Sequence, residues 1–228
     1  YRCPAEELDV GHFNTSKVTD MSGMFESCTK LKTLDLSNFD TAKVTDMSNM
    51  FTLASVLTSL DISKFNTSSV TDMSFMFSHT GLTDLDLSHF DTSNVTTISY
   101  MFSGSNALRT LDVSGFRTSK IKRMQGTFEG CTRLESVLGL TSWDTSNVEY
   151  YEDFMDKDFK INGTGLYTGL FGYVNGTIEN VGIENAVITV TSASSGKYYA
   201  GIIAYLGETG VVKNVYSTGS ITNNVSYY

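Results

Sequence analysis

The chain has 228 residues, of which 40% are apolar and 12% aromatic, so it is long and apolar enough to bury a core. Its 16 basic and 25 acidic residues give a net charge of −9, which makes nucleic acid and anionic membrane surfaces poor partners. No run of 18 apolar residues occurs, so we expect no membrane insertion within this sequence.

One unit of about 26 residues repeats along the first two thirds of the sequence. Its aligned aromatic residues are Phe13, Phe39, Phe65, Phe90, Phe116 and Trp143, at spacings of 26, 26, 25, 26 and 27 residues. Chance does not produce such regular spacing, so the sequence predicts six copies of one structural unit over residues 1–158.

The second copy shows what each part of the unit is expected to form. Leu34-Asp35-Leu36-Ser37 alternates between apolar and polar residues, which predicts a half-buried strand. Asp40-Thr41 is typical of a turn, because both side chains bond nearby backbone groups. Met47, Met50 and Phe51 have the spacing of one helix face, which predicts a helical turn or two.

No single copy can bury its apolar residues alone, so the copies are expected to stack. The sequence therefore predicts a repeat solenoid with a leucine-rich-repeat-like parallel β-ladder and short helical turns in each coil of 25–27 residues. The positions expected to be buried in the middle coils are those of Leu34, Leu36, Phe39, Val44, Met47, Met50 and Phe51.

The composition changes after Asp158, where the methionine and phenylalanine pattern ends and glycine becomes frequent. The segment 169–173 is echoed by 201–205, and similar segments follow both, at a period of 32 to 34 residues. Short β-branched runs between glycines favour strands in turn-rich coils. Residues 159–228 are therefore predicted to form a glycine-rich, β-helix-like module with two copies of its own repeat.

Two resemblances follow from these motifs. The string from Asp40 to Phe51, with the leucine-rich string from Leu82 to Phe90, resembles the BspA-like leucine-rich-repeat surface proteins of bacteria. The glycine-rich part resembles the GLUG motif of bacterial surface proteins, including IgA peptidases outside their catalytic parts. The resemblances imply a secreted or cell-surface bacterial protein of adhesive type, with no catalytic residues to carry over.

The expected function is that of an adhesin or protein-interaction scaffold, not of an enzyme. Its expected partner is a protein or other macromolecule on host or neighbouring cells, bound through the solenoid face, since stacked repeats offer extended surfaces. Two alternatives stay open, namely a non-catalytic accessory region of a surface hydrolase such as an IgA peptidase, and a passive stalk.

One row of like charges bears on binding. Outward strand positions in five successive coils carry aspartate, at Asp9, Asp35, Asp61, Asp86 and Asp112. Neighbours about 5 Å apart repel by about 1 kcal/mol in water, so something should compensate. Either serines and backbone amides donate hydrogen bonds to the carboxylates, or the row binds a cationic partner or divalent ions. In the second case the adjacent variable column would tune specificity, with His12, Asn38, Lys64, His89 and Gly115 as its members.

Two further groups have alternative readings. The cysteines Cys3, Cys28 and Cys131 share one repeat position and are expected to be structural, although a bridge between the first two stays open. An acidic cluster is expected to be either a solvated linker or a calcium site, with the members Glu149, Glu152, Asp153, Asp156 and Asp158. No other cofactor is expected.

Overall fold

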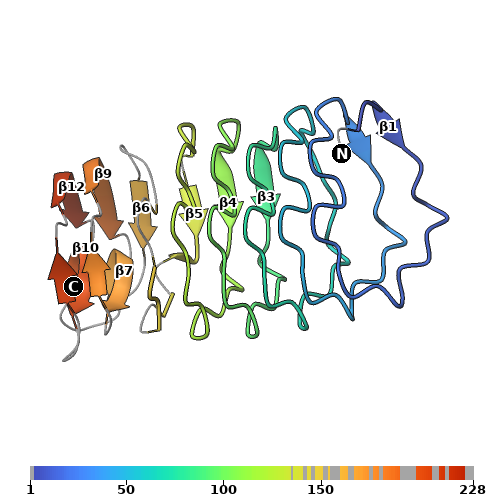
Figure 1. The fold of residues 1–228 in the computed structure, drawn as a ribbon. Coiled ribbons are helices and arrows are strands. Elements are labelled where there is room, and N and C mark those ends of the chain that lie inside the picture. Colours follow the sequence, from blue (N-terminus) through green and yellow to red (C-terminus); the bar gives the residue numbers. More distant parts are fainter. Residues whose placement is uncertain are drawn as a thin grey trace, which may run out of the picture.

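The chain winds into a row of coils that lie side by side along one axis (Figure 1). The structure is a computed structural model. It describes residues 3–134, 136–140, 143–144, 147–150 and 154, and beyond them the strands between Lys160 and Asn223. Each coil occupies about 26 residues, so residues far apart in the sequence become direct neighbours in the stack.

Short parallel strands form an interrupted ladder along one side of the coils, with no strand in the third copy. β1 (Glu7–Leu8) pairs with β2 (Thr33–Leu34), and β4 (Thr110–Asp112) lies between β3 (Asp84–Asp86) and β5 (Ser136–Leu138). In β3 the middle residue is buried and both its neighbours are exposed, as the alternating sequence predicts. We call the outer surface of this ladder the β-ladder face.

A second ladder runs along another side of the stack. Single parallel bridges join one residue of each coil to the next, in the order Asp20, Asp46, Asp72, Thr97, Arg123 and Tyr150. Each coil is therefore tied to its neighbours on at least two sides.

The segment after each second-ladder residue is not helical, so the expected helical turns were wrong. In the second copy the amides of Met47, Asn49, Phe51 and Leu53 donate to carbonyls of the next coil at 2.8–3.0 Å. Of the amides between them, those of Met50 and Thr52 donate to carbonyls three residues back along the chain, and that of Ser48 donates to Asp46 Oδ1. Asn49 and Leu53 have positive φ angles of 59° and 62°, which a right-handed helix does not accept. No α-helix occurs among the described residues.

Phenylalanine side chains stack through the centre of the coils. Successive ring centroids are 5.5–5.9 Å apart and nearly parallel along Phe25, Phe51, Phe77, Phe102 and Phe128. Of the positions expected to be buried, Phe65 and Met73 in the third copy are 4% and 0% exposed. Leu34 and Leu60 are only partly buried, because they lie at the margin of the core.

The strands beyond residue 159 also pair in parallel. Gly201 lies opposite Gly169, 32 residues earlier, and Tyr216 lies opposite Gly182. β6 lies beside β5 (Figure 1). The strands are β6 (Lys160–Gly163), β7 (Tyr167–Val174), β8 (Thr177–Glu179), β9 (Gly182–Val190), β10 (Tyr199–Leu206), β11 (Val211–Lys213) and β12 (Tyr216–Asn223). The expected boundary near residue 158 lies outside the described residues.

Candidate functional site

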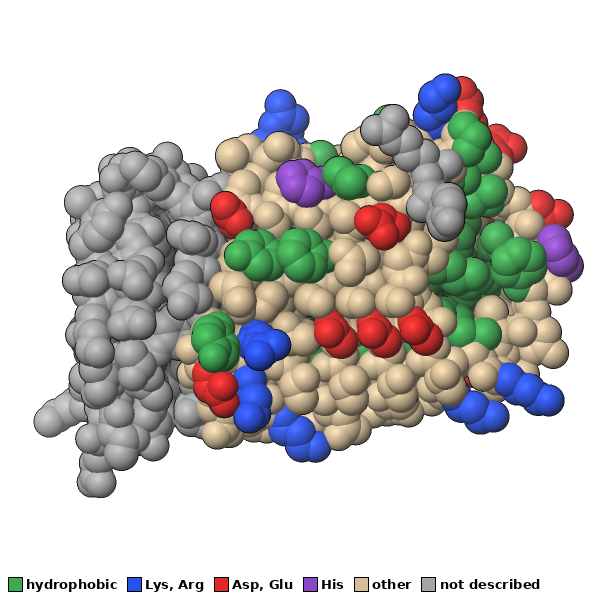
Figure 2. Space-filling model, in the orientation of Figure 1, with side chains coloured by type: hydrophobic (Ala, Val, Ile, Leu, Met, Phe, Trp, Pro, Cys, Tyr) green, Lys and Arg blue, Asp and Glu red, His purple; other side chains and the backbone are tan. Residues whose placement is uncertain are grey.

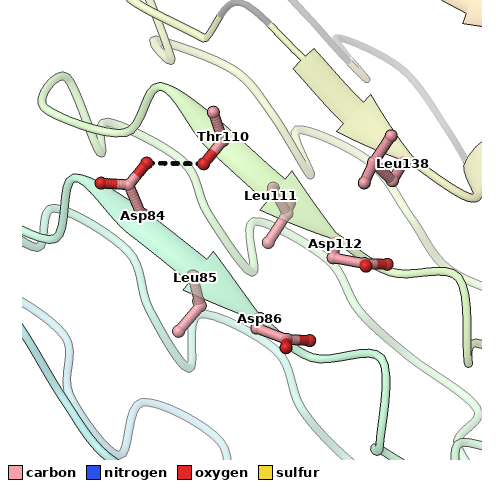
Figure 3. A pocket seen from close by; sticks show the side chains of 7 residues that line it. All are labelled: Asp84, Leu85, Asp86, Thr110, Leu111, Asp112 and Leu138. Carbon is pink, nitrogen blue, oxygen red and sulfur yellow. Dashed lines mark hydrogen bonds between the residues drawn. The ribbon is translucent and has the colours of Figure 1, made fainter.

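The aspartate row lies on the β-ladder face, as its strand positions predict. Asp86 and Asp112 are direct partners in the pairing of β3 with β4, and their side chains point the same way (Figure 3). Asp9, Asp35 and Asp86 are exposed, as is Asp61, while Asp112 is half-buried. The structure thus brings all five carboxylates onto one face.

Each carboxylate of the row closes a local turn. Its Oδ1 accepts a hydrogen bond from the backbone amide two residues later, at 2.9–3.1 Å. The Ser63 hydroxyl adds a second bond to Asp61 at 2.7 Å. The donors are Gly11, Ser37, Ser63, Ser88 and Ser114, so the structure contains the hydrogen bonds of the first reading.

These hydrogen bonds outweigh the repulsion within the row. The backbone amide and then the hydroxyl of Ser37 hold the pKa of Asp35 below its ordinary value, and the opposing effect of Asp61 is the smallest contribution. The hydroxyl and amide of Ser88 lower the pKa of Asp86 in the same way. The carboxylates of Asp35 and Asp86 are therefore charged at neutral pH without an external cation.

The variable column beside the row reaches back to the preceding coil. Asn38 Nδ2 donates to the carbonyls of Gly11 and Phe13, both at 3.0 Å. His89 Nε2 lies 3.0 Å from the carbonyl of Ile62, and Lys64 Nζ lies 3.5 Å from that of Ser37.

At the first coil, His12 Nδ1 lies 3.9 Å from Asp9 Oδ1, and both side chains are largely exposed. Within this column, Asn38 and His89 therefore act as links between coils, while His12 stands at the surface beside the row.

Shallow depressions follow the described part of the β-ladder face. One is lined by Asp84–Asp86, Thr110–Asp112 and Leu138 (Figure 3). A second lies at 60–63 and 84–86 with His89, and a third at 7–9 and 33–35. Every depression is bordered by members of the aspartate row.

Asp84 belongs to this surface, although we did not single it out from the sequence. It lies two residues before Asp86 on the exposed side of β3, and Thr110 Oγ1 donates to its carboxylate. This bond, with a second from Thr83, lowers the pKa of Asp84. The alternation Asp84-Leu85-Asp86 was the available signal, because residues two apart in a strand share a face.

A comparison with family models gives two overlapping matches, over residues 2–110 and 58–165. Both are to the family described as Mycoplasma protein of unknown function, DUF285. The chain belongs to this family. Neither the curated proteins nor the solved structures contain a match. Two overlapping placements of one DUF285 model are what a tandem repeat produces.

The acidic cluster proposed for calcium is described at Glu149 alone. Glu149 Oε1 lies 3.2 Å from Lys122 Nζ, and the other four acidic residues proposed for calcium lie outside the described residues. In the described part, no group of three or more His, Cys, Asp or Glu could hold a metal ion, and no helix is long and apolar enough to cross a membrane.

The three cysteines of the DUF285 repeat are unbridged. Cys28 and Cys131 are buried, and burial together with the neighbouring Cys3 thiol raises the pKa of Cys28 to about 12. Cys28 is therefore a protonated thiol at physiological pH, which suits a structural position.

Proposed function

We propose that this chain is an extracellular bacterial scaffold that binds a macromolecular partner, as an adhesin or protein-interaction module. The resemblance to BspA-like leucine-rich-repeat and GLUG surface proteins supports this location and class. The observation that carries the proposal is the row of carboxylates, which continues over five coils of one face. A stack of coils with one exposed chemistry along its length suits an extended partner.

The chemistry of the row favours a basic protein segment as the partner. Each aspartate uses Oδ1 in its own turn, and the row presents its carboxylates at a regular spacing of about 4.8 Å per coil. Such a strip attracts and orients a lysine- or arginine-rich segment, with a strong dependence on salt. Divalent ions are the competing ligand for the same carboxylates.

A triple change of Asp35, Asp61 and Asp86 to Asn tests the proposal. Asparagine keeps the turns, because Asn14 and Asn66 already accept the equivalent amide bonds at 3.1 Å. We expect the affinity for a fluorescein-labelled lysine decamer to fall at least tenfold, with a reduced salt dependence. Asp40→Asn is the matched control, since it removes one charge from another column with the same turn bond.

Four outcomes would decide against this proposal or redirect it. Unchanged decamer binding in the triple variant would place the ligand elsewhere. Calcium binding that is lost in the triple variant, without decamer binding, would favour an ion site. No binding of either probe would favour the passive stalk or an accessory region of a surface hydrolase. An antibody that stains cells producing the protein only after permeabilisation would contradict the extracellular location.

A further inference from the structure

Four large side chains gather on a second surface, away from the β-ladder face. They lie in the segments that follow the residues of the second ladder. We call the outer surface of these segments the turn face. Leu53 is 40% exposed and Phe75 37% exposed, and the rings of Phe75 and Tyr100 stack with centroids 4.8 Å apart. His79, also exposed, lies four residues after Phe75. Figure 2 shows hydrophobic side chains gathered on the described coils.

The backbone at these four positions is unusual for their residue types. All four have φ angles between 54° and 62°, in the left-handed region that favours glycine and asparagine. The equivalent positions of other coils carry small residues, namely Gly23, Ser27, Asn49, Gly104, Gly126 and Gly130. Bulky residues thus occupy strained positions in the middle coils, where small ones serve elsewhere.

Packing in the core does not account for the bulky residues at these four positions. The inward-facing residues of the same segments, Phe77 and Phe102, are 1% and 0% exposed and already form the central stack. The patch packs instead over neighbouring glycines: an added Cβ at Gly126 would lie 2.2 Å from the ring of Tyr100. An added Cβ at Gly104 would lie equally close to the ring of His79. The four side chains, which we call the turn-face patch, are at least partly exposed and stand on a strained backbone, and two of them pack against glycines of the next coil. These are features of a binding surface.

The charges beside the patch indicate what it would bind. Asp20, Asp46 and Asp72 follow one another in the second ladder, and Phe75 comes three residues after the last of them. Figure 2 shows a row of acidic side chains along the coils, below the hydrophobic ones. Farther along the ladder the charge changes sign at Arg123, whose guanidinium stacks on Tyr150 at 5.4 Å. The acidic side of the patch therefore complements a cation.

We propose that Leu53, Phe75, His79 and Tyr100 form a docking site for a partner protein segment that carries apolar side chains next to lysine or arginine. The apolar side chains would pack on the rings, and the cations would lie over the acidic row of the second ladder. Aromatic residues at the centre with charges at the rim are the usual arrangement of a protein interface. This site is separate from the aspartate row of the β-ladder face and does not depend on it.

The test uses two labelled hexapeptides in fluorescence anisotropy: Lys-Leu-Lys-Phe-Lys-Leu, and the same peptide with glutamate for lysine. We expect the lysine peptide to bind and the glutamate peptide not to bind. The double variant Phe75→Asn, Tyr100→Asn should raise the Kd at least tenfold at an unchanged melting temperature, because Asn49 already occupies this column. Asp46→Asn with Asp72→Asn should raise the Kd several-fold and flatten the salt dependence.

Two controls separate this site from the first one. Leu138→Asn removes a hydrophobic residue that is 54% exposed on the β-ladder face, and it should leave the Kd unchanged. The triple aspartate variant should still bind the hexapeptide, because this binding depends on Phe75 and Tyr100. If the asparagine pair melts early, Phe75→Gly with Tyr100→Gly replaces it, since glycine holds Gly23 and Gly126 in this column.

Equal binding of the lysine peptide by the double variant and the unmodified protein would overturn the proposal. So would failure of the unmodified protein to bind it. A neutral hexasaccharide that binds the unmodified protein but not the double variant, without peptide binding, would instead identify a glycan platform.

Discussion

The Thr41 hydroxyl forms two hydrogen bonds with the backbone of Asn66 in the next coil. Oγ1 accepts from the Asn66 amide at 2.8 Å and donates to the Asn66 carbonyl at 3.0 Å. The same pair of bonds recurs at Thr15, Thr92 and Thr118. These threonines are buried, so they supply partners to backbone groups that water reaches poorly.

Thr41→Val should therefore destabilise the protein although it preserves shape. Leaving a buried donor or acceptor unpaired costs about 1–3 kcal/mol for each, so we expect the free energy of unfolding to fall by about 2–4 kcal/mol. Urea titration followed by circular dichroism measures the change. Thr45→Val is the matched control, because Thr45 is exposed and donates one bond, to Thr19, so its loss should be under about 1 kcal/mol. Equal losses in the two variants would contradict the bonding role.

Phe77→Ala should interrupt the central stack. Phe77 lies between Phe51 and Phe102 at 5.6 and 5.9 Å, and removing a buried phenylalanine side chain costs about 3–5 kcal/mol. Because each coil contacts mainly its neighbours, we expect hydrogen exchange to accelerate first in the coils around residue 77. Phe75→Asn, two residues away on the turn face, should leave exchange unchanged. Uniform acceleration along the whole stack would count against nearest-neighbour coupling.

Gly115→Ala should be destabilising for a steric reason. An added Cβ would lie 1.9 Å from the Ser88 carbonyl oxygen, so the fifth coil would have to move away from the fourth. Such overpacking costs about 1–3 kcal/mol. At Gly11 an added Cβ would meet Asp9 at an ordinary 3.4 Å, and Gly11→Ala should be close to neutral. Thermal melts of both variants compare them, and an unshifted Gly115→Ala melt would disprove the close contact.

The protein should lose stability in acid through the aspartates of its turns. The pKa values of Asp35, Asp61 and Asp86 are lowered in the fold by serine hydrogen bonds, whereas an unfolded aspartate titrates near about 3.9. A lowered carboxyl pKa stabilises the fold above the unfolded value, and this contribution disappears as the pH falls through the folded value. Melting temperatures should thus be flat from pH 7 to about 5 and fall below about 4. The triple Asn variant should show a smaller fall, and an identical fall would place the acid-sensitive groups elsewhere.

The sequence predicted the repeat columns because burial imposes one residue type at each inward position. Phe65 and Met73 are buried as expected, and the aspartates share one face. The helical turns could not be excluded from the sequence, since the spacing of Met47, Met50 and Phe51 also suits a non-helical segment. What separates the two is whether alternate amides bond along the chain or to the next coil, which depends on stacking.

The patch on the turn face could not be predicted either. Leu53, Phe75, His79 and Tyr100 are not residue types that signal a left-handed backbone. Only their alignment with Gly23, Asn49 and similar residues in other copies indicates a positive φ at these positions. That alignment can be interpreted once the backbone conformation is known.

The backbone hydrogen bonds between the segments that follow the second ladder have an electrostatic consequence. In every coil from Met21 to Met124, alternate amide N–H groups of this segment point toward the next coil, and the carbonyls that accept their hydrogen bonds point toward the preceding one. Peptide dipoles aligned head to tail add, as they do in a helix. These segments therefore carry an axial dipole whose negative end lies at the first coil, close to Asp20, and this end favours the approach of a cation.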